Sequence, residues 1–141
     1  MTTRRRQARE LAFRAAYQAD VTGDPIDRCL AEIFEDLDPK AGPDVERFAS
    51  DLIRTLTEHQ PEIDAAVSRI ARNWSLARMA ATDRSVIRLA AAELLYHPDV
   101  PARVALDEAI EIAKKYGMET SGAFVNGILD RLAHEARPAA G

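Results

Sequence analysis

The sequence is poor in the residues that build metal centres and disulfides. Its one cysteine, Cys29, excludes an intramolecular disulfide and a cysteine-rich metal site, and it lies in an apolar helical pattern that predicts a core thiol. The three histidines, His59, His97 and His134, are widely separated, and no two stand four residues apart as in a helical zinc site. We therefore expect no metal site.

Long hydrophobic runs are also missing. No apolar stretch approaches the length of a membrane span, and the charged N-terminus is not followed by the hydrophobic core of a signal peptide. The sequence therefore predicts a cytoplasmic protein that makes no membrane contact.

The sequence motifs of common enzymes are absent. There is no GxxxxGK[ST] phosphate loop, no GxGxxG dinucleotide turn and no nucleophile elbow. Carboxylates are plentiful, but they stand on predicted helix faces as solvated charge, as Glu108 and Glu111 illustrate. We expect a binding protein rather than an enzyme, with no catalytic residue and no cofactor.

What the chain does contain is a repeated apolar pattern of period 3.6, with no sustained alternation of apolar and polar residues. This pattern predicts an all-α fold. A chain of 141 residues suits a single domain. We predict one domain over residues 1–141, with about seven helices in two small packed bundles, about 4–72 and 75–135, that form one compact unit.

Prolines and glycines mark the expected helix boundaries. Asp24 is the predicted cap of the second helix, the segment 38–43 separates the second helix from the third, and Pro61 opens a fourth. The apolar stripe of that fourth helix leads to Trp74, which we interpret as a core anchor.

The second half of the chain has similar boundary signals. A cap at or near Thr82 is expected to start the next long helix, Pro101 the following one, and Gly117 is expected to end it. Thr120 or Ser121 is then the predicted cap of the last helix.

Charge is unevenly distributed along the chain. Arg4, Arg5, Arg6 and Arg9 crowd the first nine residues, and residues 1–14 carry a net charge of +4 in a chain whose total is −4. A basic tip on an acidic body is typical of a localised site for a polyanion.

The alternative interpretation of these arginines is a solvated, disordered tail. Against it, Ala8, Leu11, Ala12, Ala15, Ala16 and Ala19 follow at helical spacing. The cluster is therefore expected to open a packed helix, with Arg5 and Arg9 on one face and an ion pair between Arg6 and Glu10. Arginines at a helix start oppose its dipole, so binding explains them better than stability does.

Specific motifs stand at both ends and in the middle of the chain. The strongest combines Asp99-Val100-Pro101, the run from Val104 to Gly117, and FVNGILD at 124–130; further ones are RRRQARE at 4–10 and DRSVIRL at 83–89. Together they closely resemble the NusB family of transcription antitermination factors. Residues 24–60 match that family only in helical pattern.

The resemblance implies an all-helical protein that binds the boxA RNA of ribosomal transcripts together with the ribosomal protein NusE, within an RNA polymerase antitermination complex. It places RNA contacts on two segments, the basic first helix and the turn before the last helix: Arg4, Arg5, Arg6, Arg9, Tyr116, Met118, Glu119, Thr120 and Phe124. At Thr120 one well-known member of the family has Asp. The contacts to the protein partner map onto Tyr17 and Asp83.

Elementary chemistry is compatible with this map, because guanidinium groups bridge phosphates and aromatic faces stack unpaired bases. Simpler roles stay open for three of the residues. Phe124 is equally well explained as a core residue, Tyr17 as the edge of the core, and Asp83 as an acid favoured in the first turn of a helix.

Two other functions also stay open. A similar helical domain precedes the catalytic domain of certain ribosomal RNA cytosine methyltransferases, which would require a separate domain for S-adenosylmethionine. A dimerising helical adaptor is the other, and the sequence leaves open whether the free protein is a monomer or a homo-oligomer.

Overall fold

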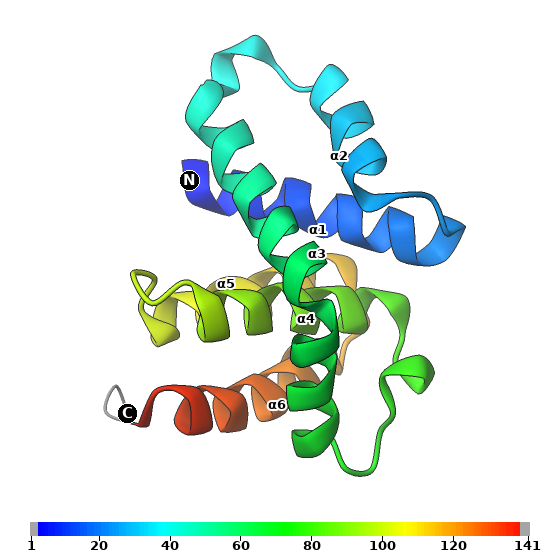
Figure 1. The fold of residues 1–141 in the computed structure, drawn as a ribbon, viewed down its shortest axis with the longest axis vertical. Coiled ribbons are helices and arrows are strands. Elements are labelled where there is room, and N and C mark those ends of the chain that lie inside the picture. Colours follow the sequence, from blue (N-terminus) through cyan, green and yellow to red (C-terminus); the bar gives the residue numbers. More distant parts are fainter. Residues whose placement is uncertain (1–2, 139–141) are drawn as a thin grey trace.

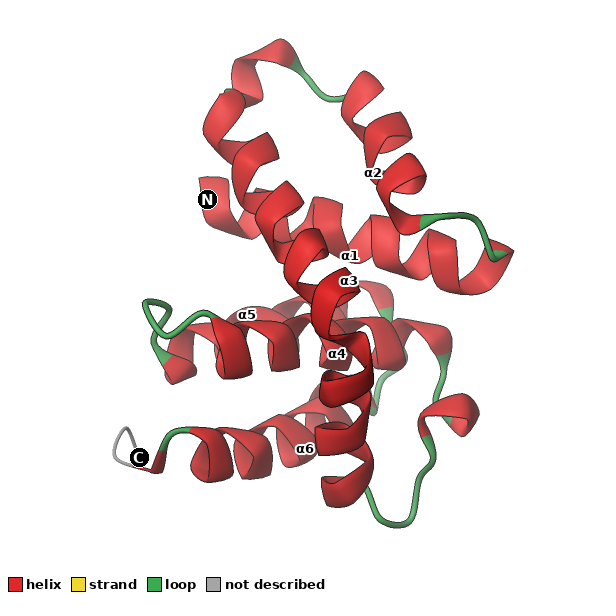
Figure 2. Cartoon of the chain, viewed as in Figure 1, coloured by secondary structure: helices red, strands yellow, loops and turns green. Residues whose placement is uncertain are grey.

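A computed structural model describes residues 3–138, and all regular structure in that range is helical (Figures 1 and 2). The elements follow in the order α1 (Arg4–Thr22), α2 (Ile26–Glu35), η1 (Pro39–Ala41), α3 (Pro43–Ile70), η2 (Leu76–Arg78), α4 (Ala81–Tyr96), α5 (Ala102–Tyr116) and α6 (Ser121–Ala136), where η marks a 3-10 turn. The all-α prediction is confirmed. The expected number of about seven helices is wrong, because the described residues form six α-helices.

The third and fourth predicted helices are one bent helix, α3. Its backbone leaves helical geometry at His59 (φ −120°, ψ 17°), two residues before Pro61, because a proline inside a helix removes a hydrogen bond and crowds the preceding turn. The end of α4 braces this kink. The His59 ring stacks on Tyr96 with 3.9 Å between ring centroids, and Thr55 Oγ1 lies 2.8 Å from His97 Nε2.

The predicted helix boundaries hold better than the predicted caps. Pro101 directly precedes α5 and Gly117 directly follows it, as expected. However, α2 has no side-chain cap, since Asp24 pairs with Arg28 instead, at 3.2 Å. Thr82 lies inside the first turn of α4 and does not cap it.

Helix α4 is the centre of the fold. Between Ser85 and Leu94 all its residues except Arg88 are buried, so the helix is enclosed on nearly every side. It contacts α1, α3, α5 and α6. Figure 1 shows α1 and α2 on one side and α5 and α6 on the other, with α3 running past both.

The buried apolar residues of all six helices form one continuous core. The continuous core is compatible with a single domain, and the division into two bundles stays a prediction. Cys29 belongs to this core as expected, and its burial raises the pKa of its thiol. Within residues 3–138, no helix is both long enough and apolar enough to cross a membrane.

Candidate nucleic-acid interface

The arginine cluster lies inside α1, not in a loose tail. Thr3 is the N-cap, and its hydroxyl oxygen accepts a hydrogen bond of 3.0 Å from the backbone N–H of Arg6. The predicted apolar stripe is buried from Ala8 to Ala16, which fixes α1 against the core. The direction of each arginine is therefore set by the rotation of a packed helix.

Arg9 faces inward from this helix. Its side chain is 5% exposed, and its Nε and Nη2 donate to the two carboxylate oxygens of Glu93 on α4 at 2.7 and 2.8 Å. A buried guanidinium needs such a partner, because an unpaired buried charge costs several kcal/mol. The expectation that Arg9 contacts RNA is therefore corrected, since this residue anchors α1 to α4.

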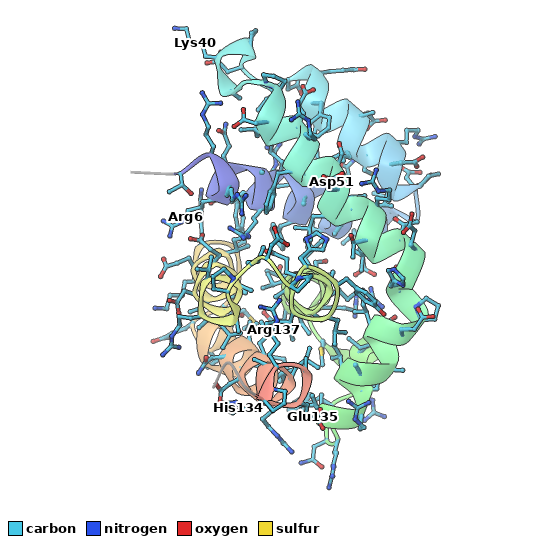
Figure 3. All side chains as sticks on the ribbon, turned by 60° about the vertical axis from the view of Figure 1, so that its left-hand side comes forward. Arg6, Lys40, Asp51, His134, Glu135 and Arg137 are labelled. Atoms are coloured by element: carbon cyan, nitrogen blue, oxygen red, sulfur yellow. The ribbon has the colours of Figure 1, made fainter. Side chains whose placement is uncertain are left out.

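Arg6 is half-buried between α1 and α5 (Figure 3). It donates to Glu108 on α5 through Nε at 2.7 Å and Nη2 at 3.0 Å, and these hydrogen bonds raise the pKa of Arg6 above its ordinary value. The predicted pair with Glu10 is wrong. Glu10 accepts from Lys115 Nζ at 3.0 Å, which raises the pKa of that lysine, and from the Tyr116 hydroxyl at 3.3 Å. The bidentate geometry with Glu108 makes this a strong charge-assisted pair.

Arg4 and Arg5 are the exposed members of the cluster. Arg4 Nη1 pairs with Asp44 Oδ1 at 2.6 Å, and the Arg5 guanidinium lies 5.0 Å from the centre of the Phe48 ring. That ring also meets Arg9, at 5.1 Å, which confirms that Arg5 and Arg9 share one face of α1.

Together with the start of α3, these arginines line a depression of about 230 Å³, which we call the basic hollow. Its lining residues are Arg4, Arg5, Asp44, Arg47, Phe48 and Asp51. Sequence reasoning missed Arg47 and Phe48, because no local pattern shows that the start of α3 lies beside the start of α1. The hollow has three guanidinium groups and two carboxylates around one aromatic ring.

The second half of α1 has a larger hollow of about 480 Å³, the tyrosine groove. It is lined by Phe13, Arg14, Tyr17, Gln18, Val21, Thr22, Thr82 and Tyr116. The ring of Phe13 lies at its base, 4.9 Å from Tyr116 and 6.1 Å from Tyr17 between centroids. A residue predicted to bind protein and one predicted to bind RNA thus share a single groove.

Asp83 follows Thr82 of that groove at the start of α4. Its Oδ1 is buried and accepts no hydrogen bond from the described residues. A buried carboxylate oxygen normally has a partner, so Asp83 Oδ1 is an exception among the described residues.

The turn between α5 and α6 is tightly built. A Cβ at Gly117 would lie 2.7 Å from the backbone oxygen of Ala113 and 2.6 Å from Ser121 Oγ, so the turn requires glycine there. Ser121 Oγ accepts a hydrogen bond of 2.9 Å from the N–H of Met118. The turn leaves three consecutive side chains exposed, those of Met118, Glu119 and Thr120.

Trp74 is not the core anchor that the sequence suggested. It is 54% exposed, because α3 ends at Ile70 and the chain then turns away from the core. Its ring meets Phe124 in the first turn of α6, with the centroids 6.0 Å apart and the rings at 80°. We call Trp74 and Phe124 the aromatic corner. Phe124 itself is half-buried and packs on the core, so both predicted roles remain compatible with its position.

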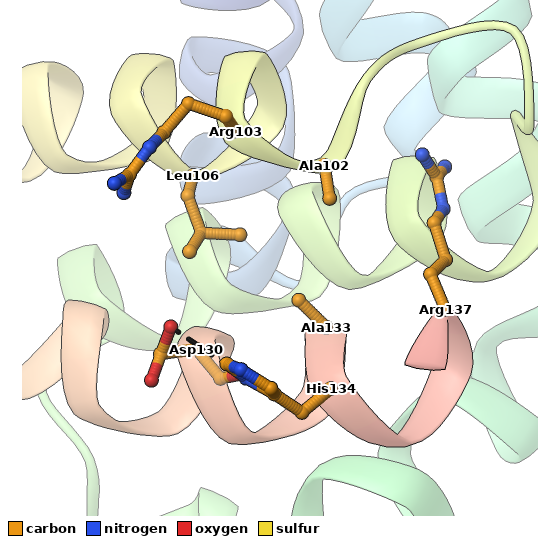
Figure 4. Close-up of a pocket in the computed structure, with 7 residues that line it drawn as sticks. All are labelled: Ala102, Arg103, Leu106, Asp130, Ala133, His134 and Arg137. Atoms are coloured by element: carbon orange, nitrogen blue, oxygen red, sulfur yellow. Dashed lines mark hydrogen bonds and ion pairs between the residues drawn. The ribbon is translucent and has the colours of Figure 1, made fainter. Parts of the chain in front are cut away.

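A further depression of about 340 Å³ lies between the start of α5 and the end of α6 (Figure 4). It is lined by Ala102, Arg103, Leu106, Asp130, Ala133, His134 and Arg137. The Arg137 guanidinium donates to four backbone oxygens around the end of α4, among them those of His97 at 2.8 Å and Val100. Arg137 therefore closes the C-terminus of α4 and is structural.

These features define a class of protein, an all-helical fold whose first helix begins with a cluster of arginines and borders two surface hollows. In the described part of the chain, no cluster of three or more His, Cys, Asp or Glu is arranged to hold a metal ion. Residues 6–134 match the model of the NusB family. The chain belongs to this family.

Curated relatives are similar along nearly their whole length. The transcription antitermination protein NusB of Anaeromyxobacter dehalogenans strain 2CP-1 is 46% identical over 139 residues, covering 99% of this chain and 96% of the relative. That of Geobacter sulfurreducens is 43% identical over 129 residues, with 92% and 93% covered.

Solved structures agree with the fold. T. maritima NusB superposes with a TM-score of 0.89 at 43% identity, covering 99% of this chain and 98% of that one. A crystal structure of the antitermination factors NusB and NusE in complex with double-stranded RNA gives a TM-score of 0.83 at 28% identity, with 96% and 99% covered.

Proposed function

We propose that this protein is a non-enzymatic antitermination factor that binds boxA RNA of ribosomal transcripts together with the ribosomal protein NusE, within an RNA polymerase antitermination complex. The observation that carries the proposal is the pair of exposed guanidinium groups, Arg4 and Arg5, on a rigid helix of an acidic chain. The family relative seen with NusE and double-stranded RNA supports both kinds of partner.

The RNA face begins at the basic hollow. Arg4 and Arg5 contact phosphates there, because a guanidinium offers two parallel donors to a phosphate. Arg6 adds positive potential to this face while it stays paired with Glu108. Arg9 does not contact RNA but holds α1 in place through its buried pair with Glu93. The face continues along α5 to a second set of RNA contacts, which is Tyr116, Met118, Glu119, Thr120 and Phe124.

The NusE face is the tyrosine groove. Tyr17 and Val21 leave 40% and 58% of their surfaces exposed there, which suits an apolar contact with a protein partner. Asp83 follows Thr82 of this groove and adds a carboxylate at its edge. Tyr116 lines the same groove, so RNA and NusE meet at one edge of α1.

The comparisons favour this proposal over the methyltransferase alternative. The curated relatives carry the name of an antitermination protein, and the chain spans 96% of the length of one of them. No observation on residues 3–138 favours a catalytic function.

RNA binding is tested by titrating a fluorescently labelled single-stranded boxA RNA at several salt concentrations and recording anisotropy. Arg4→Ala and Arg5→Ala should each weaken binding and lower the salt slope by about one. Arg28→Ala is the matched control, because its side chain is 59% exposed and ion-paired, much like the 62% exposed Arg4. Equal slopes in all three variants would refute the basic hollow as the phosphate site.

The NusE face is tested by isothermal titration calorimetry with purified NusE. Asp83→Arg should abolish the complex while circular dichroism keeps its helical signal, because a cation replaces the acceptor. Asp107→Arg, an exposed acid on α5, is the control. Undiminished binding by Asp83→Arg would show that NusE binds a different face of the protein.

A further inference from the structure

The aromatic corner exposes a large apolar ring to solvent. Trp74 is the chain's single tryptophan, and 54% of its surface is open to solvent. A large aromatic ring usually gains most when it is buried, and Phe124, its neighbour, is largely packed on the core. Trp74 is therefore an exposed apolar surface beside the first turn of α6.

Hydrogen bonds hold the backbone on both sides of Trp74. Arg84 Nη1 donates to the backbone oxygens of Leu76 at 2.8 Å and Met79 at 2.9 Å, while Asp20 on α1 accepts from its Nε and Nη2. The backbone N–H of Trp74 donates to Ala71 at 3.0 Å. A ring on a fixed turn loses little conformational entropy when a ligand stacks on it.

Two arginines stand near Trp74 in the sequence, one on each side. Arg72 and Arg78 are both exposed, and no acidic residue lies in the segment 72–78. Among the described residues, neither arginine forms an ion pair with a carboxylate, unlike Arg4 and Arg6 at the start of α1. The segment 72–78 therefore carries an exposed aromatic ring and two exposed cations that have no carboxylate partner among the described residues.

The corner also continues the proposed RNA face. Phe124 follows the exposed turn of residues 118–120 by one helical turn, and its ring contacts Trp74 directly. An exposed aromatic face on a segment that also carries two exposed arginines matches one ligand chemistry, a nucleotide of single-stranded RNA with an unpaired base and a phosphate.

We propose that Trp74 is an RNA-binding residue that stacks an unpaired base, with Arg72 and Arg78 facing the adjacent phosphates. The inference rests on the proposed function, since it extends the same RNA face from α6 to the segment between α3 and η2. It adds a stacking site that the motifs of the sequence did not indicate.

Because Trp74 is the sole tryptophan, intrinsic fluorescence reports on this site alone. Titration of the full-length protein with unlabelled single-stranded boxA RNA should quench the emission, with the same midpoint as the anisotropy of the labelled RNA. Anisotropy rising while the emission stays unchanged would overturn the stacking site and leave the proposed function intact. Absence of any RNA binding by anisotropy would instead refute the proposed function.

Variants separate stacking from charge. Trp74→Ala should weaken RNA binding about 10- to 100-fold without changing the salt slope, whereas Trp74→Phe should keep most of the affinity. Arg72→Ala should lower the salt slope by about one. Val104→Ala, at an apolar α5 residue that is 40% exposed, is the control for loss of surface area.

One more result would overturn the inference. If Trp74→Ala binds RNA as the original protein does but loses affinity for NusE, the corner belongs to a protein interface. Unchanged circular dichroism and thermal unfolding of Trp74→Ala establish that any loss of binding is local.

Discussion

The basic tip of α1 and the aromatic corner lie at two ends of the proposed RNA face, and they are built in different ways. The tip is a run of consecutive residues whose side chains the fold then separates, Arg9 inward to Glu93 and Arg4 and Arg5 outward. The corner joins Trp74 and Phe124, which are fifty positions apart in the sequence. Charge density is therefore visible in the sequence at the tip, whereas the corner has no local signal.

The comparison shows that proximity in sequence and availability for binding are separate properties. Two of the four arginines at the tip are engaged by carboxylates on α4 and α5, so half of the apparent cluster stabilises the fold. At the corner, Arg72 and Arg78 form no ion pair with the described carboxylates, although the chain as a whole is acidic.

The largest effect is expected at the inner side of the tip. Arg9→Ala should lower the free energy of unfolding by about 3–5 kcal/mol, because it leaves Glu93 buried without a partner. Urea denaturation followed by circular dichroism measures this. Arg5→Ala, which removes only a contact with Phe48, should cost about 1 kcal/mol or less. Similar losses for the two variants would remove the distinction between inner and outer arginines.

The support of the corner is the next target. Arg84→Ala should destabilise the protein by about 1–3 kcal/mol, since Leu76 and Met79 lose a charged donor. Thermal unfolding gives the stability, and a red shift of the Trp74 emission reports loosening of the turn. Arg78→Ala, in the same segment but exposed, should leave both unchanged. Unchanged thermal unfolding and unchanged Trp74 emission in Arg84→Ala would mean that the backbone alone holds the corner.

An effect of similar size is expected where the turn meets α6. Gly117→Ala should cost about 1–3 kcal/mol, because the new Cβ would overlap a backbone oxygen of Ala113. Gly127→Ala on α6 is the matched variant and should gain up to about 1 kcal/mol, since a Cβ there meets no atom within 4 Å and alanine favours helix. Chemical denaturation of both variants checks the opposite signs.

The smallest effect is expected at the outer side of the tip. Arg4→Ala should change stability by at most about 1 kcal/mol, because its ion pair with Asp44 is exposed to solvent. The difference in stability from the original protein should shrink further in about 0.5 M salt, because salt screens exposed ion pairs. The Debye length is about 10 Å at about 0.1 M salt and is shorter at this higher concentration. A larger loss that resists salt would place Arg4 among the structural arginines.

Local patterns predicted the helices well. Apolar residues at period 3.6 identified every long helix, and prolines and glycines placed most of the ends. The errors have a common cause. Pro61 was expected to separate two helices, but packing of His59 on Tyr96 lets α3 continue across it. The pattern predicts a buried Trp74 because it does not show where the chain leaves the core.

The site was predicted less completely than the fold. Family motifs indicated the α1 arginines and the turn before α6, but Arg47, Phe48 and Trp74 lie outside those motifs. Their placement depends on which helices are neighbours, and a single sequence carries little information about that. The assignment of RNA contacts to individual residues stays a prediction that the binding experiments test.

By itself the sequence determined the helical class, the family and the concentration of positive charge at the start of α1, because these follow from short-range periodicity and local motifs. Only the tertiary structure decided which cations are free to bind. Period 3.6 defines the face on which a side chain lies, but not what that face meets. Glu93 and Glu108 come from helices more than eighty residues away, and their contacts with Arg9 and Arg6 leave Arg4 and Arg5 as the exposed charges of the tip.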